Sequence, residues 1–246
     1  MSEPRAENVK LEIAANSLAS ALAAQEGGAN RVELCENLGE GGCTPSYGTM
    51  AMARERLRIP LYVLIRPRGG DFLYDALERD TMLRDIELCA RLGCDGVVIG
   101  ALDADGDVDI ALCRDFVSAA GTLGVTFHRA IDVARDPTSA LDAVIASGCG
   151  RVLTSGAHGN AIDGANNIAA LVHRAGGRIA VMAGAGITPA NVCELVQRTD
   201  VREVHASAKA LHASAMRVVR EHPGLSPAWW QSNAALVRAL RSALDG

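Results

Sequence analysis

The sequence predicts a single (β/α)8 barrel, or TIM barrel, because eight short apolar runs recur along the chain and each is followed by a stretch of helical character. No break in composition divides the chain, and a doubly wound sheet usually has fewer strands. The chain has 246 residues, of which 49% are hydrophobic, so it can bury one large core. We expect one domain over residues 1–246, with the barrel at about 9–208 and a C-terminal helical segment at about 209–246.

The strands are expected where Val, Ile and Leu gather, because strands buried on both faces of a parallel barrel need not alternate with polar residues. These runs lie at 10–14, 30–35, 60–66, 95–100, 125–129, 150–155, 178–183 and 203–207. Glycine pairs stand at several of the connections, where a positive φ is often needed. Strands and connections therefore favour the same architecture.

Several helices are expected to begin at a side-chain cap, and Ser17 is the expected N-cap of the first helix. Four later starts place a capping residue directly before a proline, which is favoured at the first helical position. They are Thr44-Pro45, Asp136-Pro137, Thr188-Pro189 and Ser226-Pro227. The last helix is expected to pack on the outside of the barrel, or on a partner chain, through one apolar stripe. The stripe consists of Trp230, Ala234, Val237, Leu240 and Leu244.

Composition and charge exclude two classes of partner. The net charge is −5, no long cluster of Lys and Arg occurs and aromatic residues make up 3%, so we expect no nucleic-acid binding. We expect no membrane span, because no run of about 18 apolar residues exists. The apolar stretch 11–24 mimics a signal peptide, but Glu12 and Asn16 interrupt it, so a strand followed by a helix is expected there instead. Seven cysteines without a CxxC pair are typical of free thiols, so we expect a cytoplasmic protein.

Polar side chains stand where several predicted strands end, and the clearest case is the run 125–132, which ends in His128, Arg129 and Asp132. Charged groups are costly to bury without partners, so this placement predicts a pocket. In a TIM barrel the carboxyl ends of all strands meet at one face, where functional groups collect. The candidates at strand ends are Glu12, Glu33, Cys35, Arg66, His128, Arg129, Ser155 and His205.

These residue types suit acid–base catalysis on a small anionic compound, such as a phosphorylated sugar. The residues expected to transfer protons are Glu33, His128, His205 and Asp132. Arginines and a glycine turn before a predicted helix favour anions. The residues expected to bind the substrate are Glu12, Arg66, Arg129, Ser155, Gly184 and Gly186. Schiff-base chemistry is not expected, since the only lysines are Lys10, at the start of the first strand, and Lys209, beyond the eighth.

Structural roles stay open for the same side chains. Glu12 and Glu33 could simply pair with arginines inside the barrel. Asp132 could cap a helix, and Ser155 could be a turn residue. A metal site with two histidines and two carboxylates is a further alternative, and its ligands would be Glu12, Glu33, His128 and His205.

Six motifs follow one another along the chain. They are Glu33-Leu34-Cys35, GGCTPSYG at 41–48, IRPRGGDF at 65–72, TFHRAID at 126–132, LTSG at 153–156 and MAGAG at 182–186. Together they resemble the CutC copper homeostasis family, over residues from about 9 to 208. The resemblance implies a cytoplasmic, homo-oligomeric TIM barrel that is associated with copper, without an agreed enzymatic activity. Copper homeostasis, acid–base catalysis and non-catalytic binding all stay open as functions.

Copper would need donors of the right kind, since Cu(I) prefers thiolates and thioethers and Cu(II) prefers imidazole with nitrogen or oxygen. Only Cys35 and Cys43 are expected on the functional face, and residue 14 is alanine where the family often has cysteine. The other cysteines are expected on helices, at 89, 113 and 193, or near the opposite end of the barrel, at 94 and 149. We therefore expect weak copper binding that depends on Cys35, Cys43 and histidines.

Overall fold

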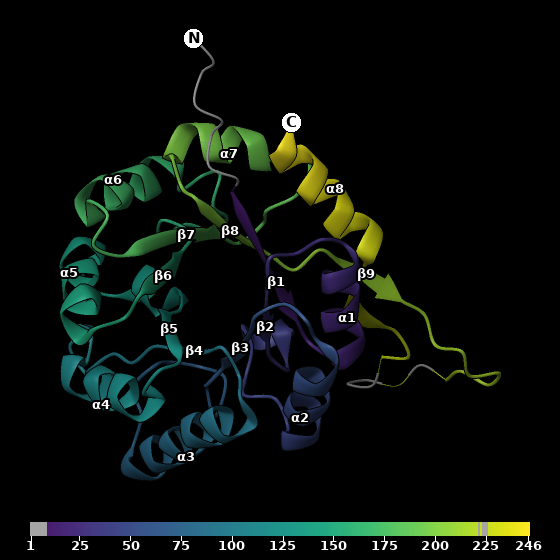
Figure 1. Ribbon diagram of the computed structural model, residues 1–246, viewed down its shortest axis with the longest axis horizontal. Coiled ribbons are helices and arrows are strands. Elements are labelled where there is room, and N and C mark those ends of the chain that lie inside the picture. Colours follow the sequence, from purple (N-terminus) through teal and green to yellow (C-terminus); the bar gives the residue numbers. More distant parts are fainter. Residues whose placement is uncertain (1–8, 221, 223–225) are drawn as a thin grey trace.

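The eight predicted strands close into a parallel barrel in chain order (Figure 1), which confirms the predicted fold class. The computed structural model describes residues 9–220, 222 and 226–246. The strands are β1 (Lys10–Ala15), β2 (Arg31–Leu34), β3 (Leu61–Leu64), β4 (Gly96–Ile99), β5 (Gly124–Phe127), β6 (Arg151–Thr154), β7 (Ala180–Gly184) and β8 (Glu203–Ala206). Their outward side chains pack against the helices in one continuous apolar core.

The α-helices of the described chain form the outer ring (Figure 1). They are α1 (Leu18–Glu26), α2 (Tyr47–Arg56), α3 (Ala76–Leu92), α4 (Ile110–Ala120), α5 (Pro137–Ser147), α6 (Ala165–Ala175), α7 (Val192–Thr199) and α8 (Ala234–Asp245). Two 3₁₀ turns, η1 (Leu38–Glu40) and η2 (Arg129–Val133), follow β2 and β5. No helix in the described ranges is both long enough and apolar enough to cross a membrane.

The expected helix starts are only partly right. Ser17 caps α1, and Asp136 caps α5 with Pro137 in the first turn, as predicted. Helix α2 begins later than expected, because Ser46 is its cap and Thr44 instead accepts a hydrogen bond from the Arg66 backbone N–H. Proline also fits turns and extended segments, and the residue before it is biased toward extended backbone.

The other two proline starts are wrong for the same reason. Helix α7 begins at Val192 after Asn191, and not at Pro189. Ser226 accepts a hydrogen bond from the Ala228 backbone N–H in a local turn, and this turn leads into a strand instead of a helix.

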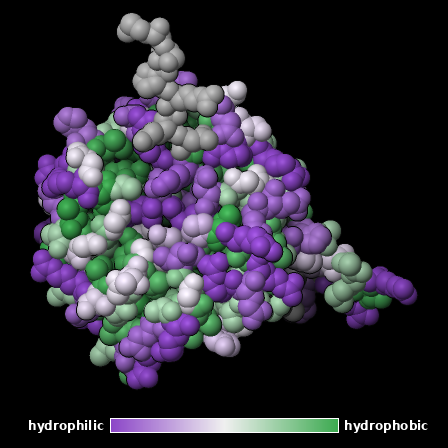
Figure 2. All heavy atoms as spheres, viewed as in Figure 1, coloured by the Kyte–Doolittle hydropathy of each residue, from purple (hydrophilic) through white to green (hydrophobic). Residues whose placement is uncertain are grey.

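The C-terminal region contains a two-stranded antiparallel sheet before its helix. Strands β9 (Lys209–His212) and β10 (Trp229–Ser232) pair, and the described chain between them projects from the barrel as an arm (Figure 1). In Figure 2 the arm stands clear of the molecule and carries hydrophobic as well as hydrophilic residues. Trp230 therefore lies in a strand, and the helical segment begins only at Ala234. Helix α8 takes the place of the eighth outer helix, between α7 and α1.

A charged network fills the amino-terminal end of the barrel interior. Arg31 pairs with both Glu12 and Glu203, and Arg151 also pairs with Glu203, with 2.6 Å between Nε and Oε2. The Tyr62 ring lies near both guanidinium groups, at 5.0 Å from Arg31 Cζ and 5.4 Å from Arg151 Cζ. Buried charges are stable only when paired, and here each of these has a partner.

Glycines on two neighbouring strands make room for the Tyr62 ring. A Cβ atom at Gly96 of β4 or at Gly124 of β5 would overlap it. The ring and the charged network therefore fill the amino-terminal end of the barrel. The interior toward the carboxyl end is left for a cavity.

Candidate active site

A cavity of about 730 Å³ lies at the carboxyl end of the barrel. Its wall includes side chains from strand ends all around the sheet, among them Glu33, Arg66, His128 and His205. The loops after β2, β3, β5, β7 and β8 and the first turns of α8 complete it. One cavity therefore brings together Glu33, Arg66, His128, Arg129 and His205, whereas the other expected strand-end residues, Glu12, Cys35 and Ser155, do not line it.

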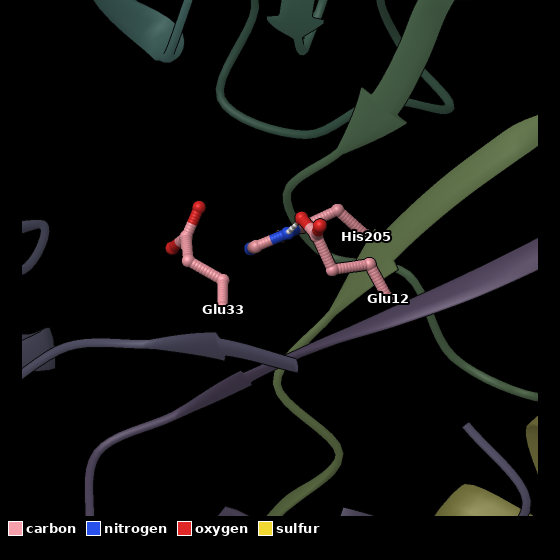
Figure 3. A group of neighbouring side chains, drawn as sticks. All are labelled: Glu12, Glu33 and His205. Carbon is pink, nitrogen blue, oxygen red and sulfur yellow. Dashed lines mark hydrogen bonds and ion pairs between the residues drawn. The ribbon is translucent and has the colours of Figure 1, made fainter. Parts of the chain in front are cut away.

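Glu12, Glu33 and His205 form a compact group on adjacent strands β1, β2 and β8 (Figure 3). His205 Nδ1 lies 2.7 Å from Glu12 Oε1, and the Glu33 carboxyl group faces the His205 ring from the other side. Glu33 is 6% exposed, and its Oε2 has no hydrogen-bond partner among the described residues. A free buried oxygen that borders a cavity is available to a ligand.

The protonation of this group follows from burial and neighbouring charge. Burial alone would raise the pKa of Glu12, but the hydrogen bond with His205 and the charge of Arg31 lower it to about 2. Burial alone would lower the pKa of His205, but Glu33 and Glu12 raise it above its ordinary value. Both shifts favour a Glu12 carboxylate that is paired with the protonated form of His205. Burial raises the pKa of Glu33 to about 7, although the charge of His205 opposes that rise.

His128 lies on the opposite wall as a neutral imidazole. Burial, and then the charge of Arg66, lower its pKa to about 3. Its Nδ1 accepts a hydrogen bond from the Ala130 backbone N–H at 3.1 Å, so the ring proton is on Nε2. Within the described structure this N–H has no acceptor. Phe72, with ring centroids 4.9 Å apart, and Gly100 hold the ring in place.

Arg66 is buried and ties two loops together. Its terminal nitrogens donate to the backbone carbonyls of Glu40, Gly42 and Gly70 at 2.7–2.8 Å, and its guanidinium lies 5.0 Å from the centre of the Phe72 ring. Arg66 makes no ion pair with any carboxylate that the structure describes. It therefore contributes positive charge to the cavity that these carbonyls only partly offset.

Asp132 has a structural role that its position in the sequence did not indicate. Its oxygens accept hydrogen bonds from the backbone N–H groups of Ser155 and Ala157, from the Thr154 and Ser155 hydroxyls and from Arg129 Nε. It thus neither caps a helix nor has an oxygen left for proton transfer, although it borders the cavity. Ser155 is a positioning residue, because its hydroxyl bridges Asp132 and the His158 carbonyl.

The glycine turn after β7 borders the cavity through Ala185 and Gly186, both with positive φ. Helix α7 starts six residues beyond Gly186, and the intervening Thr188 N–H donates to the Asn191 side chain at 2.8 Å. The sequence had led us to expect a helix N-terminus directly after this turn. The structure shows instead that the turn and helix α7 are separated by several residues.

Lys209 is a cavity residue that sequence analysis set aside. It stands at the mouth, and its ammonium lies 5.1 Å from the centre of the Trp230 ring. Only the pairing of β9 with β10 brings these residues together, and no short-range pattern marks such a pairing. Phe72 was likewise missed, because its loop position carries no periodic signal.

The two cysteines expected to bind copper, Cys35 and Cys43, do not border this cavity, whereas the histidines His128 and His205 do. Cys35 is fully buried and its Sγ donates to the Ala15 carbonyl at 3.7 Å; of the described residues that border the cavity, none is a cysteine. Glu12, Glu33 and His205 offer ligand atoms within 4.8 Å of one another, a set that suits a divalent ion. The Arg31 guanidinium already pairs with Glu12, however, and His128 lies outside the group.

Residues 9–210 match the model of the CutC family. A family protein CutC of Chromobacterium violaceum is 56% identical over 241 residues, which cover 96% of this chain and 98% of the relative. Another from Xylella fastidiosa is 60% identical over 215 residues, covering 87% and 80%. The crystal structure of a proposed copper homeostasis protein CutC from Streptococcus agalactiae superposes with a TM-score of 0.77 at 34% identity, covering 81% of this chain and 98% of that one. The chain therefore belongs to the CutC family.

Proposed function

We propose that this protein is an enzyme that moves a proton on a small anionic substrate, with Glu33 as the acid–base group. The observation that carries the proposal is a pair of buried polar atoms on opposite walls of one cavity. Glu33 Oε2 and the His128 Nε2–H both lack a partner within the described chain. Buried polar groups are nearly always satisfied, so two that border a cavity support a ligand that satisfies them.

The two groups offer complementary chemistry. A carboxyl group with a pKa of about 7 can both take up and release a proton near neutral pH. The neutral His128 N–H can donate to a substrate oxygen on which negative charge develops. An example is a carbonyl oxygen that becomes an enolate oxygen when the neighbouring carbon loses a proton. The imidazolium of His205 faces Glu33 and favours its carboxylate form after the proton has left. Proton abstraction next to a carbonyl is the reaction class that uses all three.

The charge of the wall supports an anionic substrate. Arg66 has no carboxylate partner in the described structure, and Arg129 and Lys209 stand nearer the mouth. The volume of about 730 Å³ suits a small molecule, and sites of this kind typically combine an apolar wall with a few polar groups. Phosphorylated sugars and hydroxy or keto acids carry the required anionic group and oxygen.

Copper suits this cavity less well, although the family is associated with copper homeostasis by name. Cu(I) prefers sulfur ligands, and none of the described cysteines borders the cavity. Cu(II) would suit Glu12, Glu33 and His205, but it would have to compete with Arg31 for Glu12. We therefore derive no step through copper here.

Two further proposals concern the cellular compartment and the oligomeric state of the protein. The seven free thiols support a reducing compartment, so we place the protein in the cytoplasm. Trp229 and Trp230 of β10, the strand that follows the arm, are 46% and 49% exposed, which supports burial of β10 against a second copy in a homo-oligomer. Cross-linking and sedimentation of the native protein and of a Trp229→Ser variant test the assembly.

Hydrogen–deuterium exchange on candidate substrates tests the catalytic proposal. The protein is incubated in D₂O with a panel of triose to hexose phosphates and of hydroxy and keto acids, and NMR detects deuterium at carbon. We expect exchange at one carbon of at least one compound, and a fall by about 10² or more in Glu33→Gln. Glu40→Gln, which changes a carboxylate at the cavity mouth, is the matched control and should retain exchange. If no compound exchanges, or if Glu33→Gln exchanges at the native rate, the proposal is wrong.

A further inference from the structure

One corner of the cavity contains hydrogen-bond donors but, among the described residues, no carboxylate. It is formed by residues 185–189 after β7 and residues 207–209 after β8, two strands that pair in the barrel. We call these residues the donor corner. The carboxylates that border the cavity in the described chain lie on β2, η1 and η2, and they are Glu33, Glu40 and Asp132. The donor corner is therefore suited to an anion.

The turn after β7 directs backbone N–H groups into the donor corner. Ala185 and Gly186 have positive φ angles of 87° and 68°, which alanine rarely adopts. The Ala185 carbonyl accepts a hydrogen bond from the N–H of Ala161, which does not border the cavity, at 3.0 Å. A trans peptide unit points its C=O and its N–H in opposite directions, so the Gly186 N–H points away from Ala161. Within the described chain, the N–H groups of Gly186 and Ile187 have no acceptor.

The segment after β8 supplies the other donors. Ala208 also has a positive φ, of 43°, and its carbonyl accepts a hydrogen bond from the N–H of Asn233, the N-cap of α8, at 2.9 Å. The Ser207 hydroxyl and the N–H groups of Ser207 and Ala208 have no hydrogen-bond partner among the described residues. Lys209 follows directly, and the Trp230 ring holds its ammonium at the mouth.

We propose that the donor corner binds the phosphate group of a small phosphate monoester. Backbone N–H groups of consecutive turn residues form concave sites for anions. A phosphate group has three strong acceptor oxygens, so it can receive hydrogen bonds from both segments at once and pair with an ammonium group. Helix α8 adds the positive end of its dipole, because its first turn borders the same cavity through Leu236.

This inference rests on the proposed function and names the class of its substrate, a phosphorylated carbonyl compound. In the closed barrel, β7 and β8 lie across from β3 and β4. A molecule whose phosphate group binds in the donor corner therefore extends across the cavity, between Glu33 on β2 and His128 after β5. The phosphate group only anchors the substrate, and no bond to it forms or breaks.

Calorimetric titration of the full chain with inorganic phosphate tests the donor corner. We expect one site, which Lys209→Gln should weaken by about tenfold, because a hydrogen bond between two charged groups is lost. The matched control is Lys10→Gln, which changes the only other lysine, at the start of β1 and thus at the opposite end of the barrel. Lys10→Gln should bind phosphate as the native protein does.

Gly186→Ala tests the backbone donors. A Cβ atom at residue 186 would lie 2.9 Å from Asn160 Cβ, so the turn must shift, and phosphate binding should weaken. Gly177→Ala is the matched control, because Gly177 also has a positive φ but faces open space, and it should bind normally. Circular dichroism verifies that each variant is folded. Phosphate binding that is absent from the native protein, or unchanged in both Lys209→Gln and Gly186→Ala, overturns the proposal.

The D₂O exchange assay separates this inference from the proposed function. Exchange that is confined to phosphorylated compounds supports the inference, and Lys209→Gln should then raise KM more than it lowers kcat. Exchange that is confined to acids without phosphate overturns the inference and leaves the proposed function standing. Phosphate binding that is weakened in Lys209→Gln, without exchange in any compound, supports the phosphate site and overturns the proposed function.

Discussion

Glu33 couples the protonation of one carboxyl group to the stability of the protein. Its pKa is about 7 in the folded state, above the ordinary value of 4.5, because it is buried. Below about pH 4.5 the group is protonated in both the folded and the unfolded state. As the pH rises from 4.5 to about 7, the unfolded state has already lost the proton that the folded state retains, so the free energy of unfolding falls, and it levels off once the folded state loses the proton as well.

Glu33→Gln removes this titration. We expect the variant to gain stability relative to the native protein as the pH rises from 4.5 to 8, by up to about 3 kcal/mol. Urea unfolding at a series of pH values measures the difference between the two proteins. A difference that stays constant over this range would show that Glu33 titrates normally.

Gly100 leaves room for the His128 ring because it has no side chain. A Cβ atom at residue 100 would overlap the imidazole ring, so Gly100→Ala should displace His128 and cost about 1–3 kcal/mol in stability. Gly48→Ala is the matched control, because space is open at that position on α2 and alanine favours helix. Equal stabilities of the two variants would contradict the close packing of His128.

At the scale of elements, Arg66 connects the loop after β2 with the loop after β3. We expect inorganic phosphate and sugar phosphates to raise the melting temperature of the native protein, and to do so less in Arg66→Lys. Lysine keeps the charge but cannot replace the planar fork that holds three carbonyls. Arg68→Lys is the control, since that guanidinium already pairs with Glu78. An equal rise in melting temperature with phosphate in both variants would show that Arg66 does not contribute to anion binding.

The elements also show what the sequence could and could not predict. Apolar runs and barrel geometry were enough to place the strands and to bring Glu33, Arg66, His128 and His205 to one end. The helix start at Ser226-Pro227 was wrong, because a serine before a proline fits a turn equally well. The place of Lys209 at the cavity depends on the pairing of β9 with β10, and short-range patterns do not encode such a contact.

At the scale of the whole molecule, the charged network inside the barrel joins strands from opposite sides. Glu203→Gln should remove the shared partner of Arg31 and Arg151 and cost about 3–5 kcal/mol, because it leaves buried charge uncompensated. Glu194→Gln, in the exposed pair with Arg198 on α7, should cost less than about 1 kcal/mol. Urea unfolding measures the free energy of unfolding of both variants. Similar losses would mean that the buried network stabilises the barrel no more than an exposed ion pair does.

Tyr62, Arg31 and Arg151 fill the amino-terminal end of the lumen, and the cavity of the described chain lies at the carboxyl end. Under the proposed enzymatic function, a substrate and its product bind in this same cavity and exclude one another. For a reaction with one substrate, the product should therefore be a purely competitive inhibitor. Steady-state rates are measured at several product concentrations. Double-reciprocal plots of rate against substrate concentration should then share one intercept, which corresponds to a single maximal velocity.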